Sequence, residues 1–166
     1  LKIRIRAPTN ADSFSFVVKL YTAEYPDRPC QPADDRFVAL LTTSLPACPM
    51  PGPMKCIPAD TNIAFDAVGG PVAVNGASLT ECFPAGWPAP CVDGTLGLIG
   101  NGMGGKNGSL EDGASHPWLY NDAPIAPGET FELELVIWDG HDHQLDSLVL
   151  LDAFKWHLKP DKISIH

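Results

Sequence analysis

The stretch Thr130-Phe-Glu-Leu-Glu-Leu-Val-Ile-Trp138 alternates apolar and polar residues and directly follows a Pro127-Gly128 turn. Because successive side chains of a β-strand point to opposite faces, its apolar residues at alternate positions, from Phe131 to Ile137, predict one buried face. A second apolar run, residues 147–156, comes after an acidic connection. We predict that the two runs form a β-hairpin in the core of a β-sandwich.

Short alternating or β-branched segments elsewhere in the chain predict further strands, at residues 1–6, 14–21, 37–42, 62–65 and 72–74. Convincing helical periodicity is absent. Residues 82–122 are rich in Gly, Pro, Asn and Asp, which indicates a long loop region. The predicted fold class is all-β: a two-layer antiparallel β-sandwich of jelly-roll type with long disulfide-stapled loops, forming one domain over residues 1–166.

The composition supports this fold and limits the partners. The chain has 166 residues, of which 45% are hydrophobic and 19% charged, with 15 Gly and 17 Pro. That much proline is typical of many loops that join short strands. The net charge of −9 disfavours a nucleic-acid or anionic lipid partner and favours divalent cations. We therefore expect no nucleic-acid binding and no membrane insertion.

The cysteines lie in Pro-rich or polar segments, which favours disulfides formed in an oxidising, extracellular compartment over reduced, buried thiols. Local pairing is the simplest connectivity, joining Cys48 to Cys56 and Cys82 to Cys91, although sequence alone leaves the connectivity open. Cys30 is then the odd cysteine, either a free thiol or a cross-link to another chain. A zinc site is disfavoured because no C-x-x-C spacing occurs.

Several short motifs occur in an order that resembles the choice-of-anchor L domain family. They are Tyr21-Thr-Ala-Glu-Tyr-Pro-Asp27, Asp34-Asp35-Arg-Phe37, Asn62-Ile-Ala64, Val72-Ala-Val-Asn75, Asp93-Gly-Thr95, Pro127-Gly-Glu-Thr-Phe131, Val136-Ile-Trp-Asp-Gly140 and Leu145-Asp-Ser-Leu-Val-Leu-Leu-Asp152. The version with cysteines resembles the myxobacterial branch. The resemblance implies an extracellular β-sandwich module of bacterial surface or secreted proteins, without a common enzyme activity. Asp34, Leu145 and Leu148 depart from the family's usual Asn, aromatic and Ala.

Acidic residues in the matching motifs suggest a structural calcium ion, because Ca²⁺ takes six to eight oxygen ligands and the loops of a sandwich can converge to supply them. The predicted ligands are Glu24, Asp35, Asp139, Asp142 and Asp146. The alternative is that these carboxylates are solvated and cap turns.

A second possible calcium site combines Asp93-Gly94 with Glu111-Asp112-Gly113, where acidic residues lie beside glycine turns.

Other functions are weaker alternatives. His141 and His143 suit zinc or copper only with a third ligand from His116 or His157, and exposed loop histidines are the simpler interpretation. A serine hydrolase is disfavoured because no Gly-x-Ser-x-Gly elbow occurs. A glycosidase using the same acids is disfavoured because aromatic residues for stacking a sugar are few and not clustered. We expect no enzyme activity.

A carbohydrate-binding module is the main alternative function, with tryptophans as a platform: Trp87, Trp118, Trp138 and Trp156. Trp138 and Trp156 lie at the ends of predicted core strands, where a tryptophan more often packs in the core than binds a ligand. Self-assembly into a fibre is a further possibility, through strand exchange by an unpaired segment 1–6 or the tail 162–166. The sequence therefore predicts an extracellular, structural or adhesive, calcium-binding module.

Overall fold

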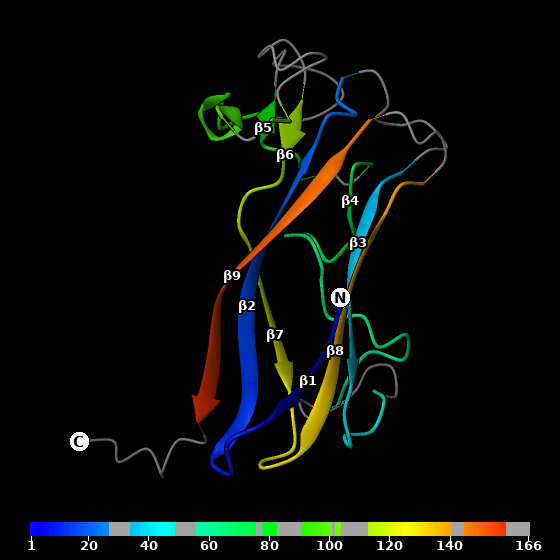
Figure 1. The fold of residues 1–166 in the computed structure, drawn as a ribbon, viewed down its shortest axis with the longest axis vertical. Helices are drawn as coiled ribbons and strands as arrows, with labels where there is room; N and C mark the ends of the chain where they lie inside the picture. Colours follow the sequence, from blue (N-terminus) through cyan, green and yellow to red (C-terminus); the bar gives the residue numbers. More distant parts are fainter. Residues whose placement is uncertain are drawn as a thin grey trace, which may run out of the picture.

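The computed structural model of the chain describes residues 1–26, 34–48, 56–75, 78–82, 91–100, 102–103, 113–140 and 145–158. Within these ranges the chain forms two antiparallel β-sheets that lie side by side as two layers (Figure 1). The single helical element among them is a short 3-10 turn, Leu96–Leu98. The prediction of an all-β fold with two antiparallel layers is confirmed.

The first sheet has the strand order β1-β8-β3-β4. Its strands are β1 (Lys2–Arg6), β8 (Thr130–Trp138), β3 (Arg36–Thr42) and β4 (Val72–Ala73). The predicted alternation holds in the first half of β8, where Phe131 and Leu133 are buried, but not in the second half, where Leu135 is partly buried and Ile137 is 42% exposed. Segment 1–6 is not an unpaired terminus, as the strand-exchange hypothesis assumed, because β1 pairs along its length with β8.

The second sheet is built on β2 (Ala11–Thr22), which pairs with β9 (Ser147–Leu158) on one side. On its other side β2 pairs with β7 (Leu119–Pro124) and β6 (Ala114–Ser115), and β5 (Glu81–Cys82) extends the sheet beyond β6. Because β2 joins most of the other strands of its layer, it is the central strand.

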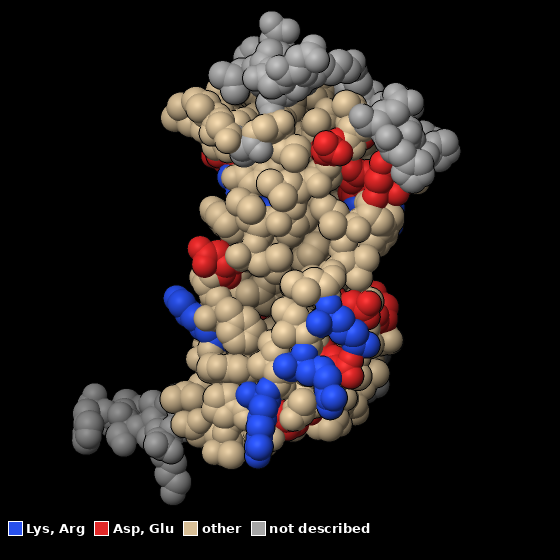
Figure 2. All heavy atoms as spheres, in the orientation of Figure 1, with Lys and Arg blue, Asp and Glu red and all other residues tan. Residues whose placement is uncertain are grey.

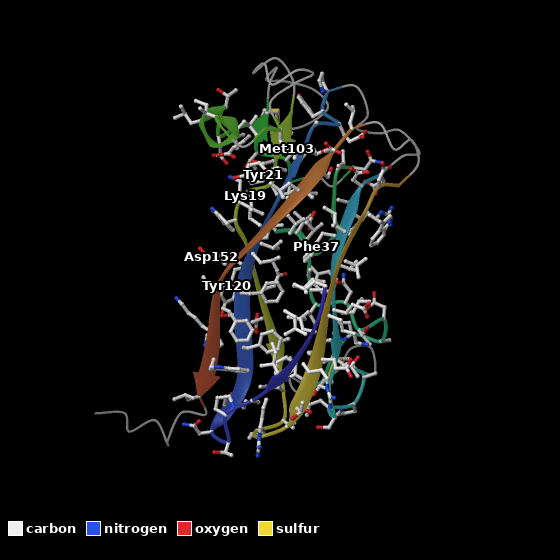
Figure 3. The ribbon with its side chains drawn as sticks, viewed as in Figure 1. Lys19, Tyr21, Phe37, Met103, Tyr120 and Asp152 are labelled. Atoms are coloured by element: carbon white, nitrogen blue, oxygen red, sulfur yellow. A yellow bond between two sulfur atoms is a disulfide. The ribbon has the colours of Figure 1, made fainter. Side chains whose placement is uncertain are left out.

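The core lies between the two sheets. Phe14 of β2 stacks on Phe131 of β8 with ring centroids 5.1 Å apart, and Trp156 of β9 meets both rings edge-on. Phe37 of β3 points into the same space (Figure 3). Burying a side chain of this size stabilises the fold by roughly 1.5–3 kcal/mol, so this aromatic cluster is a main contact between the layers.

The predicted hairpin between β8 and β9 is wrong. β8 pairs with β1 and β3, whereas β9 pairs with β2 in the opposite sheet. Both strands direct apolar side chains toward the shared core, and alternation specifies which face is buried but not which strand is the neighbour. The acidic connection therefore crosses from one layer to the other.

Most other predicted strands are confirmed, but the supposed loop region contains structure. β7 and the short strands β5 and β6 lie within or beside residues 82–122. Segment 62–65 is not a strand, and forms only the isolated bridges of Asn62 with Leu40 and of Phe65 with Pro71. Val72–Ala73 is shorter than predicted.

Two disulfides join Cys48 to Cys56 and Cys82 to Cys91, which confirms the predicted local pairing. Cys82 and Cys91 belong to a second, smaller buried cluster with Tyr25, Leu79 and Ala114. The Tyr25 hydroxyl lies 3.4 Å from Cys91 Sγ. The disulfide therefore holds the β5–β6 end of its sheet against the segment that follows β2. Cys30 lies outside the described residues.

The Glu129 carboxylate fixes the turn before β8. It accepts hydrogen bonds from the amides of Ala126 and Ser44 and from the hydroxyls of Ser44 and Thr43. Burial alone would raise the pKa of Glu129, but these hydrogen bonds outweigh it and lower the pKa below its ordinary value. The glutamate thus ties the turn at 126–129 to the segment after β3.

Candidate functional site

Four strand ends meet at one end of the sandwich. Thr22 at the end of β2 pairs with Ser147 at the start of β9, and Arg36 at the start of β3 pairs with Trp138 at the end of β8. Acidic side chains gather on the surface at this end, whereas Lys and Arg gather lower, over β1 (Figure 2). The junction of the two sheets is therefore one of the acidic parts of the visible face.

Asp35 connects the layers at this junction. Its side chain is buried, with 3% of the residue exposed. Its Oδ2 accepts a 2.5 Å hydrogen bond from the hydroxyl of Ser147, which belongs to the opposite sheet. The Ser147 hydroxyl also lies 3.0 Å from Thr22 Oγ1. Its Oδ1 accepts the Gly140 amide at 3.2 Å. One carboxylate thus contacts the start of β9 and the segment after β8.

Gly140 allows a close approach of backbone at this point. A Cβ atom at Gly140 would lie 2.5 Å from the Asp34 carbonyl oxygen and 2.6 Å from the Asp34 nitrogen. Any larger residue would push the Asp139–Gly140 segment away from Asp34–Asp35. Glycine at position 140 is therefore required by the close packing of these two segments.

Asp34 has a role that the sequence did not predict. Its Oδ2 accepts a 2.6 Å hydrogen bond from Arg36 Nε, and its Oδ1 accepts the Asn75 amide at 2.9 Å. The guanidinium offsets the Asp34 charge, and the carboxylate fixes the loop after β4. Asp34 therefore orders the junction beside the predicted ligand Asp35.

A pocket of about 180 Å³ opens at the junction. It is lined by Asp35, Ile137, Trp138, Asp139, Leu145, Asp146 and Ser147. Three of the five predicted calcium ligands, Asp35, Asp139 and Asp146, are thus brought to one pocket from three different segments. Of the other two, Glu24 is buried nearby and donates its amide to Thr22 Oγ1, but it does not line the pocket. Asp142 lies outside the described residues.

The donors present fit a calcium site in part. Carboxylate oxygens are among the ligands that Ca²⁺ prefers, and three aspartates line the pocket. However, among the residues that the structure describes, no group of three acids, histidines or cysteines is close enough to hold a metal ion. Both Asp35 oxygens already accept protein hydrogen bonds. The described residues alone therefore do not form a complete calcium site.

The second predicted calcium site is not assembled by the residues described. The Asp93 amide donates to the Thr80 carbonyl, and the Gly94 carbonyl accepts the Cys82 amide, so both lie against β5. The Gly113 amide donates to the Tyr25 carbonyl. Glu111 and Asp112 lie outside the described ranges.

The histidines do not form a shared metal site in the described structure. His116 is fully buried, with Nε2 3.0 Å from the Ala73 carbonyl and Nδ1 3.1 Å from the Ser78 hydroxyl. Burial lowers the pKa of His116 below its ordinary value, only partly opposed by the Ala73 hydrogen bond and the Asp66 charge. His157 lies elsewhere, with Nε2 2.8 Å from Ser15 Oγ. His141 and His143 are outside the described residues.

The three tryptophans that the structure describes do not share one platform. Trp156 packs in the aromatic core, Trp138 lies half exposed beside the acidic pocket, and Trp118 is 48% exposed just before β7. Trp87 lies outside the described residues. Of the tryptophans in the predicted platform, Trp118 is the one with another exposed aromatic residue close in sequence, Tyr120, which is 62% exposed.

A buried ion pair escaped prediction. Lys19 Nζ lies 2.6 Å from Glu81 Oε2, with side-chain exposures of 7% and 15%, and the Ser115 hydroxyl donates to the same oxygen at 2.6 Å. The Glu81 carboxylate rests against Gly97, where a Cβ atom would lie 2.2 Å from its oxygens. Lys19 and Tyr21 point to the same side of β2 (Figure 3), with Nζ 5.1 Å from the ring centroid. Lys19 and Glu81 are 62 residues apart in sequence, so no local sequence pattern predicts their ion pair.

The chain matches no protein-family model, no curated protein and no solved structure. None of the helical structure in the described ranges is long and apolar enough to span a membrane. The two disulfides are consistent with an oxidising, extracellular environment.

Proposed function

We propose that this chain is an extracellular, calcium-binding structural module of a bacterial surface or matrix protein, with a jelly-roll type of sandwich and no enzyme activity. The observation that carries the proposal is the gathering of Asp35, Asp139 and Asp146 around one pocket at the ends of four strands. A bound cation would offset the negative charges of these three carboxylates, with further oxygen ligands completing the set, because the described acids are not close enough to hold an ion by themselves. Residues 141–144, which include Asp142, connect two walls of this pocket in sequence.

A calcium ion at this position would stabilise both layers. The pocket walls come from the start of β3, the end of β8 and the start of β9, which belong to different sheets. An ion bound to the folded state alone adds stability by mass action. We therefore infer a structural role for the ion, in keeping with the resemblance to the choice-of-anchor L domains.

Thermal melting with calcium and with a chelator tests the proposal. At a calcium concentration about 100-fold above Kd, mass action adds about 2.7 kcal/mol, or roughly 5–10 °C for a chain of this size. Asp146→Asn and Asp139→Asn should lose most of this shift while melting like the wild type in chelator. Asp122→Asn, an exposed aspartate on β7, is the matched control and should keep the full shift. Equal melting temperatures with and without calcium would refute the proposal.

A carbohydrate-binding role is the second candidate, favoured by Trp118 and Tyr120. Both are exposed, Trp118 directly before β7 and Tyr120 within it, two residues further along the chain. Aromatic rings of this kind combine an apolar face with a polar tip. Binding to a glycan array that is lost in Trp118→Ala and Tyr120→Ala would support this role, and no binding to any glycan would remove it.

A further inference from the structure

β9 is an outer strand with an unusually apolar surface. It runs for 12 residues, Ser147–Leu158, and pairs with β2 alone among the described strands. In Figure 1 its lower half lies outermost in its layer. It carries several large apolar side chains that are at least 40% exposed, namely Leu150, Leu151, Phe154 and Leu158. Outer strands with exposed apolar residues are templates for pairing with another chain.

A bulge in the middle of β9 restricts what can pair with it. Ser15 of β2 is opposite Lys155 and Val17 is opposite Asp152, so two residues of β9 face the single residue Phe16. Ala153, one of these two, has a left-handed φ of 53°. An ordinary strand added at the outer edge would fall out of register at this bulge, because it lacks the extra residue. A second copy of β9 carries the same bulge, so it has the extra residue that an ordinary strand lacks.

Two opposite charges flank the bulge on one face of the sheet. Asp152 and Lys155 are both exposed, and their partners Val17 and Ser15 are two apart on β2, so both point to the same face. Figure 3 shows Asp152 at the outer margin of the layer, beside β9. If two β9 strands run antiparallel about an axis through the bulge, Asp152 of each copy faces Lys155 of the other. The same register places bulge residue 153 of each copy opposite bulge residue 154 of the other.

We infer that two copies of this chain associate through antiparallel pairing of their β9 strands, which makes one continuous sheet across a two-fold axis. This inference goes beyond the proposed calcium module and does not depend on it. The same surface patch serves both partners, so the contact is closed and makes a dimer. A fibre would require a second, different contact.

Charge exchange tests the register. Sedimentation velocity over a concentration series should show a monomer–dimer equilibrium for the wild type. Asp152→Lys and Lys155→Asp each place like charges opposite one another at two symmetric positions, and each should raise the dimer Kd about tenfold or more. The double variant Asp152→Lys/Lys155→Asp restores opposite charges and should recover the wild-type Kd to within about threefold.

Two controls keep the test decisive. Asp122→Lys reverses a charge on β7, across β2 from Lys155, and should leave the Kd unchanged. Asp152 Oδ1 accepts the Ala153 amide at 2.6 Å, so Asp152→Asn, which keeps an acceptor, separates loss of charge from local disruption. Hydrogen exchange of β9 amides should slow as concentration rises. A monomer at every concentration would overturn the inference, as would a dimer that is insensitive to both single reversals or not restored in the double variant.

Discussion

Ser147 Oγ donates a 2.5 Å hydrogen bond to Asp35 Oδ2, which joins the first residue of β9 in one sheet to the residue that precedes β3 in the other. The two residues are 112 positions apart in sequence. Because Asp35 also holds the Gly140 amide, this carboxylate fixes the relative position of three strand ends. Asp35 and Ser147 also line the acidic pocket at this junction.

Ser147→Ala should destabilise the fold. The substitution removes a hydrogen bond to a carboxylate that is almost fully buried, at a cost of about 1.5–3 kcal/mol. Denaturant unfolding in the presence of a chelator measures the loss without any contribution from calcium. Ser13→Ala, at a half-buried position of β2, is the control and should cost less than about 0.5 kcal/mol. Equal free energies of unfolding for the two variants would show that the Ser147–Asp35 hydrogen bond does not stabilise the fold.

Ala153→Gly should stabilise the monomer. Ala153 has a φ of 53°, in the left-handed region that costs an L-residue about 1–2 kcal/mol and costs glycine almost nothing. The gain, about 0.5–1.5 kcal/mol, should appear as a higher midpoint of unfolding at low protein concentration. Ala126→Gly, away from the positive-φ positions, should instead lower the midpoint. A lower midpoint for Ala153→Gly would show that the bulge does not strain Ala153.

His116 should make the fold less stable in mild acid. Its pKa is lowered by burial in the folded state, so the unfolded chain binds the proton more readily. The stability that neutral His116 contributes to the fold is complete above its pKa in the unfolded chain, about 6.5. It is lost as the pH falls toward the lower pKa of His116 in the folded state. The free energy of unfolding should decline between about pH 6.5 and 5, and His116→Gln should flatten this decline although its overall stability is lower. An unchanged slope in the variant would assign the decline to other groups.

Glu129 should stabilise the fold at neutral pH and not in strong acid. Its lowered folded pKa means that the stabilisation is present above the unfolded pKa, about 4.3, and disappears as the pH falls through the folded value. Glu129→Gln should therefore lower the melting temperature at pH 7, and the difference from the wild type should narrow below about pH 4. Glu134→Gln, on the exposed side of β8, should have little effect at either pH. A difference that stays constant with pH would contradict this account.

The sequence predicted the elements whose burial follows a simple period and missed those whose burial does not. In β8 the apolar residues alternate, so the strand and the buried positions Phe131 and Leu133 were predictable, whereas the exposure of Ile137 near the strand end was not. In β7 the alternation is equally regular, but Asn121 takes a buried position and Pro124 ends the strand, so the segment resembles a loop. The amide oxygen of Asn121 accepts the Phe65 amide, a partner that only the fold provides.

The candidate site, likewise, could be predicted only where local sequence patterns specify it. The disulfides were found because each pair spans a short Pro-rich segment, and three of the five proposed ligands meet because strand ends on different sheets converge. The contacts of Asp34, Ser147 and Gly140 depend on which strands are neighbours, and periodicity does not specify that. For the same reason β8 and β9 were wrongly placed in one hairpin.

Direct measurement of calcium binding tests the central claim most sharply. Isothermal titration of chelator-stripped protein should show one calcium ion bound per chain, with binding reduced at least tenfold in Asp139→Asn/Asp146→Asn and unchanged in Asp122→Asn. No heat of binding in the wild type, or equal binding in the double variant, would show that the pocket between the two sheets is not a calcium site.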